Sequence, residues 1–188
     1  MQNSKLVQYP KIQMDGAQLK PLELDHADEM FALIDRNRFY LREHLPWLDI
    51  SRSAEDSRGY IQMTLEQRKA SVALVTGIWW NGKFAGTIGT HPIDWKNQKA
   101  SLGYWISEDL QGKGLITSAC RAFLKYLFEI AQLNRVEIYC GTTNEKSQAV
   151  PKRLGMKHEG TLRESENLYG RYVDHHLYAM TASDYRTK

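Results

Sequence analysis

Hydrophobic positions recur along the chain with two periods, about 3.6 residues in some stretches and two in others, which predict helices and strands respectively. In the stretch 115–131 the apolar positions lie three and four residues apart, while Arg121, Lys125 and Glu129 form a polar face. In chain order the pattern predicts a strand at 12–22, a helix from Asp25, a helix at 38–50 broken at Pro46, a helix at 53–69, two strands flanking Asn81-Gly82, a strand at 99–107, a helix after Gly114, a strand at 135–141, a short helix at about 146–154, and strands at 157–164 and 171–181.

Turn and cap residues support several of these boundaries. Ser53 and Asp56 have the spacing of a capping box, which marks the start of a helix. Asn81-Gly82 is a strong hairpin signal, because a type I′ turn needs positive φ at both central positions. No repeat, low-complexity tract or linker interrupts the chain. The order of elements predicts an α/β (α+β) fold with a mixed sheet covered by helices, in one continuous domain over residues 1–188 with its core at about 12–185.

The composition is that of an ordinary globular protein, with 42% hydrophobic and 25% charged residues among 188. No apolar run approaches the roughly 20 residues of a membrane helix, and the first residues lack the apolar segment of a secretory signal. We therefore expect a cytoplasmic protein with no membrane partner. Cys120 and Cys140 belong to no C-x-x-C pair, so reduced thiols are expected. The net charge of +3 is too small to indicate nucleic-acid binding.

The stretch "YWISEDLQGKGLITSAC" (104–120) places two glycines where a strand ends and an amphipathic helix begins. A Walker A loop would need a glycine at Ser107 and a hydroxyl residue at Gly114, and a dinucleotide-binding loop would need its third glycine at Thr117. Both patterns fail. The remaining interpretation is a loop whose unpaired N–H groups at 112–117 face an anion at a helix N-terminus. Spacing alone fits a tight turn without a ligand equally well.

Several segments together resemble the GNAT N-acetyltransferase superfamily. The segment Q-G-K-G-L-I-T (111–117) is similar to its Q/R-x-x-G-x-G/A acyl-CoA loop, with Ile116 in place of the last small residue. The segment "NEKSQAVPKRLGM" (144–156) is similar to its N-x-x-S segment, which ends in L-G-F/M. The chain also resembles the branch that acetylates the N-termini of ribosomal proteins, such as the serine of L7/L12 or the alanine of S5. The segments that carry this resemblance are "LREHLPWL" (41–48), "ASLGYWI" (100–106) and "LYGRYVDHHLYAM" (168–180).

The resemblance covers residues 12–185 and implies a GNAT fold, with a mixed and mostly antiparallel sheet of about seven strands, and acetyl-CoA as co-substrate. Ser147 would donate a hydrogen bond to the leaving thiolate, and Asn144 would bind the pantetheine arm. A backbone N–H near Ile106, in a strand splayed by a β-bulge, would hold the oxygen of the tetrahedral intermediate. The implied cofactor-binding residues are Ile106, Gln111, Gly112, Lys113, Gly114, Leu115, Ile116, Thr117, Asn144 and Ser147.

The residues do not single out a base for the acceptor amine. Glu166, in the connection before the last strand, is the first choice and would act through water. Glu43, His44 and Asp94 are alternatives, and many relatives carry a glutamate where this chain has Ser101. With Ser147, Glu166 completes the set of candidate catalytic residues.

We expect acetyl transfer to a primary amine, foremost the N-terminal α-amine of a protein. Its pKa of about 7.7–8.0 makes it easier to deprotonate than a lysine side chain, near 10.4. A polyamine or other small-amine acetyltransferase, including one for aminoglycosides, is an alternative. A non-catalytic acyl-CoA-binding regulator is another.

The remaining aromatic, histidine and cysteine residues suggest no further chemistry. The five tryptophans are expected in the core or in an interface, and a homodimer could use Trp47 or the pair at 79–80. Neighbouring His175 and His176 alternate faces on a strand and cannot easily share one ion, so no metal site is expected. Cys140 is expected to be a small buried apolar side chain close to the thioester.

Overall fold

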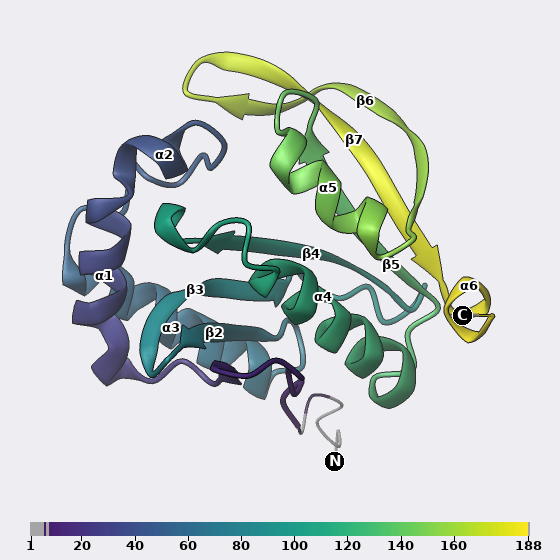
Figure 1. Ribbon diagram of the computed structural model, residues 1–188, viewed down its shortest axis with the longest axis horizontal. Helices are drawn as coiled ribbons and strands as arrows, with labels where there is room; N and C mark the ends of the chain where they lie inside the picture. The colour runs from purple at the N-terminus through teal and green to yellow at the C-terminus, as the bar shows by residue number, and fades with distance from the viewer. Residues whose placement is uncertain (1–5, 7, 188) are drawn as a thin grey trace.

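The computed structural model describes residue 6 and residues 8–187, and its strands form one seven-stranded sheet (Figure 1). The strands are β1 (Ala17–Lys20), β2 (Val75–Trp80), β3 (Lys83–Thr90), β4 (Lys99–Ile106), β5 (Arg135–Gly141), β6 (Lys157–Leu168) and β7 (Arg171–Thr181). The helical elements are η1 (Leu24–His26), α1 (Ala27–Arg36), α2 (Arg38–Arg42), α3 (Ala54–Lys69), η2 (Glu108–Leu110), α4 (Leu115–Lys125), η3 (Tyr126–Ile130), α5 (Glu145–Arg153) and α6 (Ala182–Arg186).

The sheet is mixed and mostly antiparallel, which confirms the expected fold class. Its strand order is β1-β2-β3-β4-β5-β7-β6, and only β4 and β5 run parallel to each other. That parallel pairing covers Lys99–Leu102 against Arg135–Ile138 and then stops, although both strands continue. The two strands therefore separate in the middle of the sheet.

Each face of the sheet has its own hydrophobic core, because successive strand residues point to opposite sides. On one face Ile78 and Ile88 pack with Phe123 and its neighbours from α4. On the other face Trp79 packs with residues of α1 and α3, such as Ile61. The hydrophobic stripe predicted for 115–131 is the one that is buried, so the helical period identifies the buried face of α4 correctly.

Several local predictions are confirmed. The Ser53 side chain accepts a hydrogen bond from the N–H of Asp56 at the start of α3. Asn81 and Gly82 have φ values of 49° and 80°, as the predicted hairpin turn requires. Gly155 follows α5 with a φ of 66°. The sequence predicts that the tryptophans lie either in the core or in an interface. Trp79 and Trp105 lie in a hydrophobic core, so the interface alternative is wrong for these two.

Other predictions differ from the structure at element ends. The first strand is only four residues long, because Gly16, with a φ of 74°, ends a turn just before it. Asp25 does not cap a helix, since it lies inside η1, where Glu23 and His26 form the capping box. The helix expected at 38–50 is limited to the five residues of α2. No helix in the described part of the chain has both the length and the apolar character to cross a membrane.

Candidate active site

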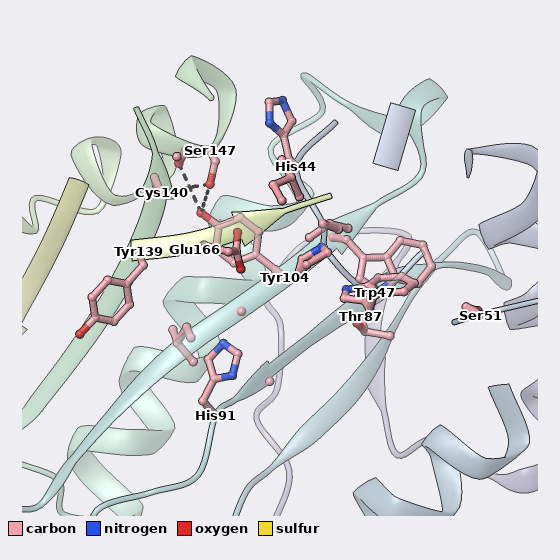
Figure 2. A pocket seen from close by; sticks show the side chains of 18 of the residues that line it. His44, Trp47, Ser51, Thr87, His91, Tyr104, Tyr139, Cys140, Ser147 and Glu166 are labelled. Atoms are coloured by element: carbon pink, nitrogen blue, oxygen red, sulfur yellow. Dashed lines mark hydrogen bonds between the residues drawn. The ribbon is translucent and has the colours of Figure 1, made fainter. Parts of the chain in front are cut away.

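A cavity of about 840 Å³ lies where β4 and β5 separate. Most residues of the segment 43–51, after α2, and residues of α3 line one side, and residues of β6 and β7 line the other. Figure 2 shows Tyr104, Cys140 and Ser147 meeting at one end of it, joined by hydrogen bonds, with Glu166 in the same space. The cavity thus collects side chains from segments far apart in the sequence.

The opening between β4 and β5 exposes backbone groups of β4. The N–H of Ser107 donates to the carbonyl of Ala85 at 2.9 Å, on the β3 side of the strand. Successive N–H groups of a strand point to opposite sides, so the N–H of Ile106 points toward the opening. The bulge expected near Ile106 is absent, because β4 pairs with β3 and β5 without a register shift. The strands separate instead because β5 continues by pairing with β7 on its other side.

The glycine turn before α4 presents unpaired backbone donors. Gly112 and Gly114 have φ values of 74° and 77°, a conformation that favours glycine, and an added Cβ would meet nothing within 4 Å at either position. The N–H of Gln111 donates to Glu108, and the next N–H to find a backbone acceptor is that of Ser118, which donates to Gly114. Between them, the N–H groups of residues 112–117 have no acceptor among the residues that the structure describes. The turn can therefore accept an anion without breaking a bond.

The side chain of Gln111 is held by hydrogen bonds to two other side chains. Its Nε2 donates to the hydroxyl of Tyr40 in α2, and its Oε1 accepts from Nζ of Lys146 at 2.7 Å. Gln111 thereby links α2 to α5. Lys146 brings a second cation, besides Lys113, to the side of the glycine turn, and sequence reasoning missed it.

Ser147 belongs to a hydrogen-bonded chain at the end of the β4–β5 opening. Its Oγ lies 3.1 Å from the hydroxyl of Tyr104 and donates to Sγ of Cys140 at 3.3 Å. Asn144 caps α5, since its Oδ1 accepts from the N–H of Ser147 at 3.0 Å. The capping bond fixes the Ser147 backbone and leaves the amide –NH₂ of Asn144 for another partner.

Burial controls the protonation of this chain of groups. It raises the pKa of the Tyr104 phenol well above its ordinary value, with smaller contributions from the two cysteines. It also raises the pKa of the Cys140 thiol, which is 1% exposed, as expected for a buried apolar side chain. Tyr104 is therefore a neutral hydrogen-bond donor, and Ser147 is the polar hydroxyl that it orients.

Glu166 reaches the cavity through an irregular strand. The connection expected at 165–170 is wrong: β6 extends to Leu168, and the turn consists only of Tyr169-Gly170. A register shift between Leu162 and Glu166 turns the strand, and the Glu166 carboxylate then lies 3.5 Å from Nε2 of His175. Glu166 lines the cavity together with that histidine.

The alternative bases are distributed differently. Glu43 and His44 both line the cavity, and burial lowers the pKa of His44, so its imidazole is neutral at neutral pH. Asp94 is wrong as a candidate, because its carboxylate binds Asn97 in the turn before β4 and does not line the cavity. His176 points away from His175, and its Nδ1 lies 2.9 Å from Oγ1 of Thr161, which confirms the expected alternation.

Tyr104 and His175 are two cavity groups to which sequence reasoning gave no role in the reaction. Tyr104 lies in the quoted strand two residues before Ile106, so strand period two could have placed both on one side. His175 pairs in space with Glu166 only because β6 is irregular. No local pattern in the sequence predicts the register shift that makes β6 irregular.

The separation of β4 from β5 and the free N–H groups of the glycine turn are the two features that the resemblance to GNAT acetyltransferases implies, and comparisons with known proteins agree. Residues 17–157 match the sequence profile of the acetyltransferase (GNAT) domain. YdaF of Bacillus subtilis (strain 168) is 35% identical over 163 residues, 86% of this chain and 89% of its own. The ribosomal-protein-serine acetyltransferase of Escherichia coli (strain K12) is 30% identical over 165 residues, 88% of this chain and 92% of its own.

Solved structures agree with the sequence relatives. The ribosomal L7/L12 alpha-N-protein acetyltransferase RimL, in complex with coenzyme A, superposes with a TM-score of 0.87 at 25% identity, over 91% of this chain and 97% of its own. The microcin C7 self-immunity acetyltransferase MccE, in complex with acetyl-CoA and AMP, gives a TM-score of 0.86 at 28% identity, over 89% and 93% of the two chains. The chain belongs to the GNAT acetyltransferase family and is an N-acetyltransferase.

Proposed function

We propose that this chain transfers the acetyl group of acetyl-CoA to the N-terminal α-amine of a protein, by direct attack in a ternary complex. The observation that carries the proposal is the meeting of the β4–β5 opening, the Ser147 hydroxyl and the Glu166 carboxylate in one cavity beside the open glycine turn. The ribosomal-protein acetyltransferases among its relatives support the choice of acceptor.

The N–H groups of residues 112–117 are proposed to bind the diphosphate of acetyl-CoA. Six donors at a helix N-terminus suit two negatively charged phosphates, and Lys113 and Lys146 add positive charge nearby. Leu115 and Ile116 contribute their backbone, since Leu115 is buried and Ile116 packs against the core. The free –NH₂ of Asn144 suits a carbonyl of the pantetheine arm.

The reaction needs one proton removed and one delivered. Glu166 is proposed to take the proton of the attacking amine through a water molecule, with His175 beside it to orient the carboxylate. The N–H of Ile106 would stabilise the oxygen of the tetrahedral intermediate, and one such donor is typically worth about 3–4 kcal/mol. As the C–N bond forms and the C–S bond breaks, Ser147 Oγ would donate a hydrogen bond to the thiolate. The thiolate takes a proton from water and leaves as the thiol, and Glu166 returns its proton to water.

A polyamine is the second candidate acceptor, because the cavity carries more carboxylates than permanent cations. Among the residues that the structure describes, Glu43, Asp56 and Glu166 line it, against Arg171 alone, so a cationic acceptor is attracted before it loses its proton. Spermidine N(1)-acetyltransferase of Escherichia coli is a more partial relative, 29% identical over 92 residues. The charge balance does not separate an α-ammonium from a polyamine, so the acceptor assay must do so.

The test is thiol release from acetyl-CoA, followed with dithionitrobenzoate, over a panel of acceptors. The panel contains peptides that begin with Ser, Ala or Lys, the same Ser peptide with a blocked N-terminus, spermidine and an aminoglycoside. We expect turnover of the free α-amines, none of the blocked peptide, and acetyl on the α-nitrogen by mass spectrometry. Reaction with spermidine or the aminoglycoside alone would contradict the proposed acceptor. Binding of acetyl-CoA without turnover of any amine would indicate the regulator instead.

The role of Glu166 has a matched control in the same strand. Glu166→Gln should lower kcat by about 100-fold and leave the affinity for acetyl-CoA within about twofold, because general-base catalysis contributes about 10²–10⁴. Glu164→Gln makes the same chemical change at an exposed position outside the cavity and should behave as the unmodified chain. Equal kcat values for the two variants would remove Glu166 from the reaction.

We further propose that the chain forms a single acetyltransferase domain with its core at about residues 12–185, that the protein is cytoplasmic, and that it forms a homodimer. Phe39, which is 93% exposed, is a better candidate for a dimer surface than Trp79, which is buried. Sedimentation velocity tests the dimer, and a monomer at all concentrations would contradict it.

A further inference from the structure

The tip of the β6–β7 hairpin is tied to the loop between α2 and α3 across the acceptor side of the cavity. In Figure 1 the tip extends over the sheet and lies beside that loop. The hydroxyl of Tyr169 donates to the carbonyl of Leu45 at 2.6 Å and accepts from the N–H of Leu48 at 3.1 Å. One phenol thus satisfies two backbone groups of a segment more than 120 residues away in the sequence.

A second contact holds the ring of the same tyrosine. The guanidinium carbon of Arg42, in the last turn of α2, lies 3.7 Å from the centroid of the Tyr169 ring. Arg42 is itself fixed by two hydrogen bonds to the carboxylate of Asp49, at 2.8 and 2.9 Å. Cation–π stacking and bidentate pairing are both directional contacts, so they orient the ring as well as hold it. We call Tyr169 with its bonds to Leu45, Leu48 and Arg42 the clasp.

The hairpin turn is shaped for this contact. Tyr169 has a φ of 54° and Gly170 a φ of 86°, and the N–H of Gly170 donates to Oδ1 of Asn167 at 2.8 Å. Positive φ at both positions is what a two-residue type I′ hairpin turn requires, and the turn places the Tyr169 hydroxyl against Leu45 and Leu48.

The clasp joins the two sides of the acceptor cavity. Leu45, Pro46 and Trp47 line the cavity from the loop. Leu168 and Arg171 line it from the hairpin, and Glu166 lies only three residues before Tyr169. The clasp therefore ties together the two sides that line the cavity around Glu166.

We infer that Tyr169 is a positioning residue, which sets Glu166 against the acceptor amine and restricts acceptors to an amine at the end of a narrow, extended chain. The inference rests on the proposed function. A peptide N-terminus enters between the tied sides, whereas an amine on a bulky ring system needs them to separate. Tyr169 itself does not line the cavity, so its influence on the acceptor is exerted through the loop and the hairpin.

The test uses Tyr169→Phe, which removes both hydrogen bonds and keeps the ring beneath Arg42. We expect kcat for a Ser-initial peptide to fall about fivefold, with KM for acetyl-CoA within about twofold of the unmodified chain. The kcat/KM of an aminoglycoside relative to that peptide should rise about fivefold. Tyr172→Phe is the control, because this residue lies in the same hairpin with its side chain 63% exposed, and neither quantity should change.

A double-mutant cycle tests whether Tyr169 acts through Glu166. In the Glu166→Gln background, adding Tyr169→Phe should change kcat by less than about 1.5-fold, because the carboxylate that it positions is gone. A fivefold effect in both backgrounds, or an unchanged acceptor ratio, would overturn the inference. If Tyr169→Phe has no effect while Glu166→Gln remains impaired, the clasp fails and the proposed function stands. Full activity of Glu166→Gln would reject both the proposed base and the positioning role.

Discussion

The glycine turn and the acceptor cavity are built from the chain in opposite ways. The donors at 112–117 are consecutive, and the helix that orients them begins at once, at Leu115. The clasp joins Leu45 and Tyr169, which are 124 positions apart, and Glu166 faces the cavity through an irregular strand. The acetyl donor therefore meets a site set by local backbone conformation, whereas the acceptor meets one set by tertiary contacts. Changes on the two sides should have separable effects.

The largest effect is expected on the glycine turn. Gly114→Glu places a bulky anion and an unfavourable φ where the diphosphate is proposed to bind, and should lower kcat/KM more than 100-fold for every acceptor alike. Calorimetry with coenzyme A should detect no binding. Gly59→Glu, on the exposed face of α3 with open space around it, adds the same charge as a control. Normal coenzyme A affinity in Gly114→Glu would contradict the assignment, and a melting curve checks that the variant folds.

Ser147→Ala should act on the reaction without acting on either binding event. We expect kcat to fall about 10-fold or more, since the leaving thiolate loses its hydrogen-bond donor. The capping bond from the Ser147 N–H to Asn144 remains, so coenzyme A affinity should stay close to that of the unmodified chain. Single-turnover measurement gives the chemical step directly. An unchanged rate would exclude Ser147.

Tyr104→Phe should have a smaller effect, because it removes only the group that orients Ser147. We expect kcat to fall about fivefold, corresponding to the roughly 1 kcal/mol of a typical hydrogen bond. The raised pKa keeps the phenol protonated beyond its usual range, so Tyr104 should add no alkaline limb to the pH–rate profile up to about pH 9.5. Tyr185→Phe, whose hydroxyl binds Glu129 far from the cavity, is the control. A profile limb that disappears only in Tyr104→Phe would show that the phenol titrates.

The smallest effect is expected at the start of α3, on the acceptor side. Ser53→Ala removes the cap and should lower stability by about 1 kcal/mol, which corresponds to a Tm decrease of about 2–4 °C in a chain of this size. KM for acetyl-CoA should not change, because α3 does not contribute to the glycine turn. Calorimetric melting measures the loss of stability, and steady-state kinetics give the KM for acetyl-CoA and the KM for the acceptor peptide. A change in the KM for acetyl-CoA would show that the two sides are coupled.

Local patterns predicted the parts of the fold that depend on neighbours in sequence. The bounds of β5 and β7, the Ser53 cap and the Asn81-Gly82 turn follow from period, propensity and the demand for positive φ. The positive φ at Gly112 and Gly114 belongs to the same class. These features need no knowledge of what packs against them.

Tertiary contacts decided the rest. The segment after Glu164 is polar and has no strand period, yet it extends β6 because its backbone pairs with β7 at the edge of the sheet. Tyr104 became part of the site only because β5 leaves β4 after Leu102. Asp94 is held in a turn by Asn97, and Lys146 lies beside Gln111. Both placements depend on side-chain contacts that the spacing of residues in the sequence does not predict.

The measurement that tests the central claim most directly is a crystal structure of the protein with coenzyme A. The account predicts diphosphate oxygens within hydrogen-bond distance of the N–H groups at 112–117, and the sulfur in the β4–β5 opening beside Ser147 Oγ. A diphosphate bound elsewhere, with the turn at 112–117 empty, would contradict it.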